Sequence, residues 1–250
     1  MSDSEEIAVD LFQEPDGYFK ERKAASQTMV ERGNGEKIVL DLAPEHSLWG
    51  HVLWNASRVI LNQMDEGIID VRGKRVLELG SGAGLASIAS CLNGAAAVYA
   101  TDYPDEELIE RLQTNINRNT KDTACDVHVA GFAWGSDTAP LLADGLFDVI
   151  ILSDLLFNHS QHGALLRTCR ECLAPGGVVR VAFSSHRPWL QHKDLAFFDL
   201  AVDRTVVSNG ECCFAVTELD PVRMPVMFEE DPGDIEIRRT VKIYIMELVE

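Results

Sequence analysis

The stretch from Val76 to Leu85 combines a short apolar run with three glycines on alternate positions, Gly80, Gly82 and Gly84. The run predicts a buried strand, and the apolar pattern that starts at Leu85 predicts a helix. Glycine at such a turn permits positive φ and lets a ligand approach the backbone. The first amides of the helix then face the end of the strand. We therefore predict that a nucleotide-like ligand binds here, at the edge of an α/β sheet.

Two residues further along the chain could contact the same ligand. Asp102 follows an apolar run at 96–101, and a carboxylate there can accept both ribose hydroxyls of an adenosine. The alternative is that Asp102 caps the next helix. Trp134 ends the run that starts at Val127 and could lie against an adenine, although core packing would explain a tryptophan equally well.

The segment Ser153–His159 follows the almost wholly apolar run 147–152 and is the candidate for a second ligand. Asp154 can hold an amine, and Phe157 offers a π face for a cation. We therefore predict Asp154, Phe157 and the adjacent Asn158 as catalytic residues. The alternative is a helix cap at Asp154 with Phe157 in the core.

Three histidines lie near this predicted edge of the sheet. His159 and His162 could act as bases, but histidines on exposed loops more often have no catalytic role. The segment Ser185–Pro188, which contains His186, follows the next strand and is a weaker candidate for a substrate rim.

The elements that must position these residues alternate between strand and helix patterns, which predicts an α/β fold with helices on both faces of the sheet. No helix pattern separates the last two strands, so one of them should run antiparallel. The predicted strands cover 38–42, 76–79, 96–101, 127–134, 147–152, 178–183, 214–217 and 241–246. The predicted helices run from a cap at Ser47 to Met64, from Leu85 to Leu92, from a first position at Pro104 to Ile116, from Leu165 to Leu173 and from Lys193 to Arg204.

The first part of the chain is polar, and we expect an irregular N-terminal arm at 1–36 followed by a single domain at 37–250. In the segment 11–19, two apolar pairs flank a turn-forming Pro-Asp-Gly. We expect this segment to dock on the domain and to cover part of the site. An ordinary packing arm is the alternative.

Composition narrows the choice of partners. Asp plus Glu number 40 against 22 Lys plus Arg, a formal net charge of −18, which disfavours direct nucleic-acid binding. Such acidity suits a basic protein partner or serves only solubility. We expect no membrane span, a cytoplasmic location with reduced cysteines and a monomer. Cys169-x-x-Cys172 lacks a second Cys or His pair, so we expect packing there and no metal.

The order E-x-G-x-G-x-G from Glu78 to Gly84 resembles motif I of the seven-strand methyltransferases that use S-adenosylmethionine. Further motifs resemble the protein-lysine methyltransferase branch of that family: Trp49 before the first core helix, Asp102, Trp134-Gly135 and Asp154-x-x-Phe157. The resemblance implies a class I, Rossmann-like sheet that is mostly parallel with an antiparallel C-terminal strand. It also implies cofactor contacts from Trp49, Glu78, Gly80, Ser81, Gly82, Gly84, Asp102, Trp134 and Ser153. Trp54 lies further into the predicted helix, and we expect it to pack.

Within that branch, the segments at 11–17, 48–55, 101–105 and 157–159 resemble the fungal-type protein N-terminal and lysine methyltransferases of translation elongation factor 1-alpha. This resemblance implies methylation of the substrate's N-terminal glycine and the lysine beside it. Open alternatives are another protein substrate, a small nicotinamide-like acceptor and a non-catalytic binding module. A nucleotide-binding oxidoreductase is disfavoured, because its G-x-G-x-x-G motif would need a glycine or alanine where Leu85 stands.

Overall fold

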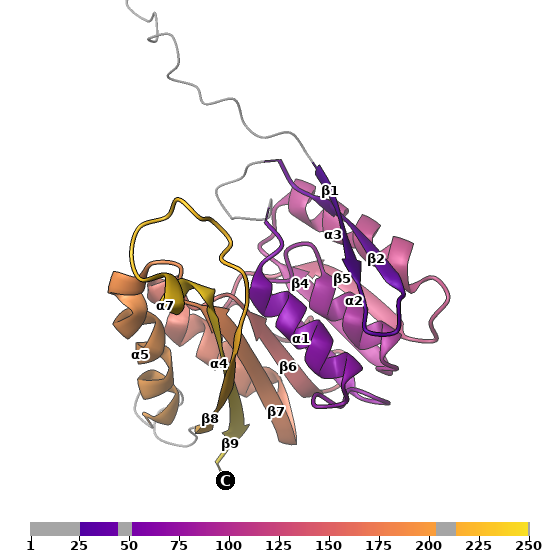
Figure 1. Cartoon of the computed structure of the whole chain (residues 1–250). Coiled ribbons are helices and arrows are strands. Elements are labelled where there is room, and N and C mark those ends of the chain that lie inside the picture. The colour runs from indigo at the N-terminus through magenta and orange to yellow at the C-terminus, as the bar shows by residue number, and fades with distance from the viewer. Residues whose placement is uncertain (1–25, 45–51, 204–213, 250) are drawn as a thin grey trace, which may run out of the picture.

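The computed structural model describes residues 26–44, 52–203 and 214–249, and its centre is a seven-stranded sheet (Figure 1). The strand order is β5-β4-β3-β6-β7-β9-β8. Strands β3 to β7 run parallel, and β9 runs antiparallel to both of its neighbours. The predicted α/β fold with an antiparallel C-terminal strand is therefore confirmed. The strands are β3 (Arg75–Leu79), β4 (Ala97–Asp102), β5 (Asp126–Gly131), β6 (Phe147–Ser153), β7 (Leu173–Ser184), β8 (Phe214–Arg223) and β9 (Thr240–Leu248).

Helices cover both faces of this sheet, each over its own apolar core (Figure 1). One core lies under α1 (Asn55–Asp65), α2 (Leu85–Leu92) and α3 (Glu106–Thr120). The other lies under α4 (His162–Cys172) and α5 (Gln191–Val202) and contains Cys169 and Cys172, so both cysteines pack as predicted. Three short helices complete the described chain: η1 (His159–Gln161), η2 (Pro188–Leu190) and α7 (Ile235–Arg239). In the described residues, no helix has the length and apolar character needed to cross a membrane.

A separate two-stranded antiparallel hairpin, β1 (Ser26–Glu31) and β2 (Lys37–Leu42), lies beside α3 (Figure 1). Asn115 on α3 donates to the Asp41 carbonyl and accepts from the Asp41 amide, so it serves as a substitute partner for the strand. The buried Arg32 pairs with Asp65 at 2.6 Å. The prediction of irregular structure is wrong for 26–31, because this strand shows polar side chains on its exposed face and gives little apolar alternation.

Element boundaries differ from the prediction at several places. Helix α1 begins at Asn55 with Trp54 as its N-cap, so Val52 and Leu53 precede the helix; Ser47 lies outside the described residues. Pro104 also precedes its helix, because Asp105 is the N-cap and accepts the Leu108 amide at 3.1 Å. The predicted helix end at 173 is wrong, since strand β7 begins there, and α7 separates β8 from β9 although no helix pattern predicts it.

Candidate active site

The glycine loop between β3 and α2 has the conformation that its sequence predicts. Gly80, Gly82 and Gly84 all have positive φ, at 67°, 54° and 84°. A Cβ on Gly80 would lie 2.6 Å from a methyl carbon of Leu155, so a larger residue would have to displace that side chain in addition to adopting a positive φ. A Cβ on Gly82 would meet nothing within 4 Å, which leaves open space over the loop for a ligand.

Asp102, the last residue of β4, holds this loop. One carboxylate oxygen accepts the Gly82 amide at 2.6 Å and the other accepts the Tyr103 amide at 2.7 Å. Burial raises the pKa of Asp102, and these two hydrogen bonds oppose the rise. The alternative that Asp102 caps the next helix is wrong, since Asp105 is the cap.

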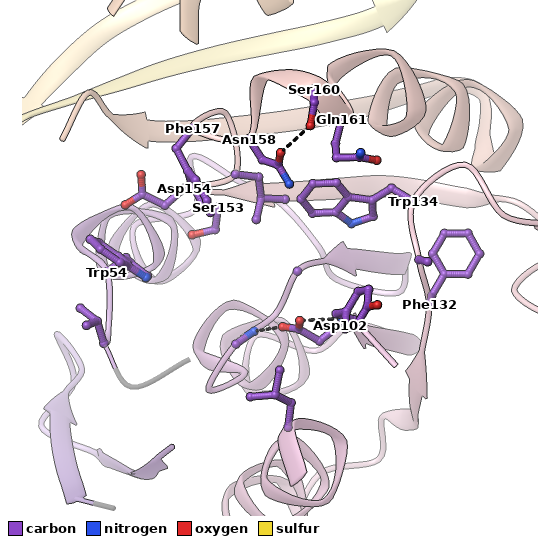
Figure 2. A pocket seen from close by; sticks show the side chains of 17 residues that line it. Trp54, Asp102, Phe132, Trp134, Ser153, Asp154, Phe157, Asn158, Ser160 and Gln161 are labelled. Atoms are coloured by element: carbon purple, nitrogen blue, oxygen red, sulfur yellow. Dashed lines mark hydrogen bonds between the residues drawn. The ribbon is translucent and has the colours of Figure 1, made fainter. Parts of the chain in front are cut away.

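A cavity of about 390 Å³ lies above the loop (Figure 2). Its walls come from the carboxyl ends of four neighbouring strands, which contribute Gly80, Asp102, Trp134 and Ser153. Binding at the carboxyl ends of the strands is the rule for open α/β sheets. Figure 2 shows Trp134 and Phe132 at one end of this cavity and Trp54, Asp154 and Phe157 at the other.

Asp154 is unusual in its burial, its backbone conformation and its hydrogen bonding. It is 4% exposed and is the only non-glycine residue with positive φ among those described, at 60°. Its Oδ1 accepts the Ser184 amide and His186 Nε2, both at 3.1 Å, whereas Oδ2 is buried and has no hydrogen-bond partner among the described residues. A strained backbone and an unsatisfied buried acceptor both mark a functional position. The alternative of Asp154 as a helix cap is therefore wrong, because Asn158 and Gln161 are the caps that follow.

In the loop after Asp154, Phe157 and Asn158 line the cavity, whereas His159 and His162 form contacts away from it. Phe157 is 38% exposed and Asn158 lines the cavity, so Phe157 is not a core residue. His159 Nε2 lies 2.7 Å from Asp194 on α5, and His162 Nε2 lies 2.8 Å from the Leu156 carbonyl. Neither histidine lines the cavities of the site, and both tie the loop to the domain.

A second cavity, of about 300 Å³, shares Trp54, Asp154 and Phe157 with the first. We call these three residues the shared wall. The expectation that Trp54 lies further into the helix is wrong, because Trp54 is the N-cap of α1. Its indole packs against His186 and Phe228 and lines both cavities. The remaining lining residues of the second cavity are His186, Arg187, Phe228 and Asp231.

The segment between β8 and α7 closes the second cavity. The Phe228 ring meets Trp54 edge to face, with centroids 6.1 Å apart. Two hydrogen bonds hold this segment: Asn55 donates to the Pro225 carbonyl and Arg238 donates to the Phe228 carbonyl, each at 2.7 Å. Phe228 and Asp231 are not predicted from the sequence, since their segment is polar and has no periodicity. The only signal is an aromatic residue beside acidic ones.

The comparisons with known proteins agree with this geometry. Residues 37–203 match the family model for lysine methyltransferases. The protein N-terminal and lysine N-methyltransferase efm7 of Schizosaccharomyces pombe is 39% identical, and the alignment covers 98% of both chains. The corresponding protein of Eremothecium gossypii is 37% identical, with 96% of this chain and 94% of that protein covered. The chain belongs to the lysine methyltransferase family. Its near full-length relatives place it among the protein N-terminal and lysine N-methyltransferases.

A solved structure supports the fold of this methyltransferase. The 16S rRNA N2 G1207 methyltransferase RsmC of T. thermophilus superposes with a TM-score of 0.55 and 18% identity, covering 89% of this chain and 50% of that one. At this identity the likeness shows the class I methyltransferase fold alone. The predicted cofactor of the enzyme, S-adenosylmethionine, fits the first cavity, which offers open space over Gly82, a carboxylate at Asp102 and an indole at Trp134.

The predicted cofactor residues of the methyltransferase fall into three groups. Gly80, Gly82, Asp102, Trp134 and Ser153 line the first cavity. Glu78, Ser81 and Gly84 lie in or behind the loop and are not among the lining residues, so their direct contact with the cofactor stays a prediction. Trp49 lies outside the described residues, as does the predicted lid at 11–19.

Glu78 joins β3 to α2 below the loop. It is 1% exposed, and its Oε2 accepts the Ser87 amide at 2.9 Å and the Ser87 hydroxyl at 2.5 Å. Burial raises the pKa of Glu78 to about 7, and the hydrogen bonds from Ser87 oppose this rise. The folded state therefore binds this proton more tightly than the unfolded state.

The raised pKa of Glu78 gives a stability prediction with a defined sign. Since the folded state holds the proton in a pH range where the unfolded state has lost it, this contribution to stability is present at low pH and is lost as the pH rises through about 7. In Glu78→Gln, the side-chain carbonyl still accepts from Ser87 and nothing ionises. We expect the free energy of unfolding of the wild type to fall by about 3 kcal/mol relative to Glu78→Gln between about pH 5 and pH 8. Urea unfolding of both proteins across this range measures the difference, and parallel pH curves would contradict it.

Proposed function

We propose that this enzyme methylates the N-terminal glycine and the adjacent lysine of translation elongation factor 1-alpha, acting as a monomer in the cytoplasm. The observation that carries the assignment of the site is Asp154 in the shared wall, with one carboxylate oxygen that no described group satisfies. The net charge of −18 supports a basic protein as the partner. The four described cysteines are free thiols, which suits a reducing compartment.

The two cavities give the enzyme the geometry that an in-line displacement needs. S-adenosylmethionine, when bound, supplies a methyl group activated by a sulfonium. Asp102 and Trp134 hold the cofactor in the first cavity, and the acceptor amine enters through the second. Trp54 and Phe157 offer aromatic faces to a cation, and Asp154 Oδ2 accepts a hydrogen bond from the amine. Fixing both reactants at the shared wall supplies most of the catalysis by orientation.

The acceptor amine must be neutral when it reacts, and its pKa determines the free energy needed to deprotonate it at a given pH. Deprotonation at pH 7 costs about 1 kcal/mol for an α-amine and about 4.6 kcal/mol for a lysine. The N-terminal glycine is therefore the easier first acceptor, and the lysine depends more strongly on the site. This difference predicts that methylation of the α-amine precedes methylation of the lysine.

Mass spectrometry of purified elongation factor 1-alpha after incubation with the enzyme and S-adenosylmethionine tests the substrate. We expect mass gains in steps of one methyl group, located by fragmentation at the N-terminal glycine first and at its neighbouring lysine later. A substrate with an acetylated N-terminus is the matched control and should gain methyl groups on the lysine alone. No gain, with calorimetry still showing cofactor binding, would overturn the substrate and leave the enzyme class unchanged.

A further inference from the structure

His186 occupies a fixed position beside the shared wall. Its Nε2 lies 3.1 Å from Asp154 Oδ1, and its ring centroid lies 4.5 Å from that of Trp54, with the ring planes at 52°. The side chain lines the second cavity and is 20% exposed. The imidazole therefore contacts the place where the acceptor amine is proposed to react, and it keeps a path to solvent.

The hydrogen bond to Asp154 determines which ring nitrogen is free. A carboxylate only accepts hydrogen bonds, so Nε2 carries a hydrogen and the lone pair of the neutral ring is on Nδ1. None of the described residues forms a hydrogen bond with Nδ1. The arrangement of carboxylate, imidazole and free nitrogen is the one that general bases use.

Asp154 does not account for the removal of a proton from the acceptor amine, a step that the proposed reaction requires. Its carboxylate orients an ammonium but also stabilises the charged form, whereas the nucleophile must be neutral. We propose that His186 Nδ1 accepts the proton of the acceptor amine and that Asp154 holds the imidazole in position; this inference rests on the proposed amine methylation. The nitrogen lone pair then forms the N–C bond, the electron pair of the C–S bond goes to sulfur, and His186 releases its proton to solvent.

The charges around the imidazole favour this role. Asp154 follows β6, Asp194 lies on α5, and Asp231 lies on the segment that closes the cavity. Burial lowers the pKa of His186, and these three carboxylates outweigh burial, so the pKa is raised above its ordinary value. The neighbouring Arg187 is the opposing charge, and it donates to the Phe157 carbonyl at 3.5 Å. A raised pKa brings the base closer to the pKa of the amine, which makes the proton transfer less uphill.

The test compares two substitutions in the full-length enzyme. His186→Gln keeps a hydrogen-bond donor for Asp154 but has no basic nitrogen, whereas His186→Ala leaves a space that free imidazole can fill. We expect both to lower kcat by about 10²- to 10⁴-fold, with the Kd of S-adenosylmethionine within threefold of the wild type. Added imidazole should restore His186→Ala at least tenfold and leave His186→Gln unchanged. Among substituted imidazoles, rescue should rise with their pKa.

Two outcomes would overturn the role of His186. Near wild-type kcat in His186→Gln would show that a hydrogen-bond donor to Asp154 suffices and that no basic nitrogen is needed. Rescue of His186→Ala that does not depend on the pKa of the added imidazole would show the same. Both variants are compared with the wild type on any amine acceptor that the wild type methylates. Failure of the wild type to methylate elongation factor 1-alpha would therefore count against the proposed substrate and not against His186.

Discussion

The Asp154→Asn variant should lose about 10²- to 10⁴-fold in kcat/KM for methyl transfer while its affinity for S-adenosylmethionine stays within a few-fold of the wild type. Asparagine has the shape of aspartate but presents an amide nitrogen or a neutral oxygen where the acceptor amine meets a carboxylate. It also weakens the hold on His186, whose Nε2 lies 3.1 Å from Oδ1. Initial rates with saturating cofactor, together with calorimetry of cofactor binding, measure the two quantities separately.

The fold should tolerate this substitution, because asparagine accepts left-handed backbone at least as readily as aspartate does. Asp154→Gly removes the strain at φ 60° but leaves the Ser184 amide and His186 without their acceptor, so we expect no net rise in its free energy of unfolding while transfer activity is lost. Asp148→Asn is the matched control. Asp148 lies at the opposite end of β6, the strand that Asp154 follows, and its carboxylate accepts the Arg75 amide at 2.8 Å. Full transfer activity in Asp154→Asn with intact cofactor binding would refute the role of this carboxylate.

The Asp102→Ala variant should bind S-adenosylmethionine about 10- to 100-fold more weakly, because a hydrogen bond to a charged group contributes about 1.5–3 kcal/mol. The carboxylate serves twice: it accepts the Gly82 amide at 2.6 Å, which shapes the glycine loop, and it is the predicted partner of the ribose hydroxyls. Its burial raises its pKa, so the folded protein gives up a costly buried charge in this variant. We therefore expect the loss to appear in cofactor affinity more than in stability.

Asp105→Ala is the control for Asp102→Ala, three residues along the same segment. Asp105 caps α3 through its bond with the Leu108 amide, and removal of such a cap costs about 1 kcal/mol of stability. We expect Asp105→Ala to unfold at lower urea concentration and to bind the cofactor normally. The assignment of Asp102 would be wrong if both variants changed cofactor affinity equally, or if neither did.

The residues that could be predicted from the sequence are those whose signals are local. Gly80 and Gly82 stand between a strand pattern and a helix pattern, and Asp102 and Asp154 each follow an apolar run, so the carboxyl edge of a parallel sheet brings them together. The sequence also contained enough information to predict the contact between Asp154 and His186, since these residues follow two neighbouring parallel strands, β6 and β7. The sequence does not show which of the residues along one edge will make contact.

The residues that escaped prediction depend on tertiary packing. Trp54 is predicted inside a helix because the apolar spacing at 52–64 fits a longer helix than α1. The residue at which α1 begins depends on contacts outside that segment. Phe228 reaches the second cavity because Asn55 and Arg238 hold its segment in place, and they bond it across 170 and 10 residues of sequence. Neither hydrogen bond has a periodic or motif signal.

The shared wall also indicates how an inhibitor could be built. The two cavities meet at Trp54, Asp154 and Phe157, so a single compound with an adenosine at one end and an alkylamine at the other could occupy both by passing along these residues. Once the adenosine is bound, the amine is held at an effective concentration set by its linker, and affinity can exceed that of either half by about 10²- to 10⁴-fold. The linker must be short, because it takes the place of the methyl carbon, which lies between the acceptor nitrogen and the sulfur of the cofactor during an in-line transfer.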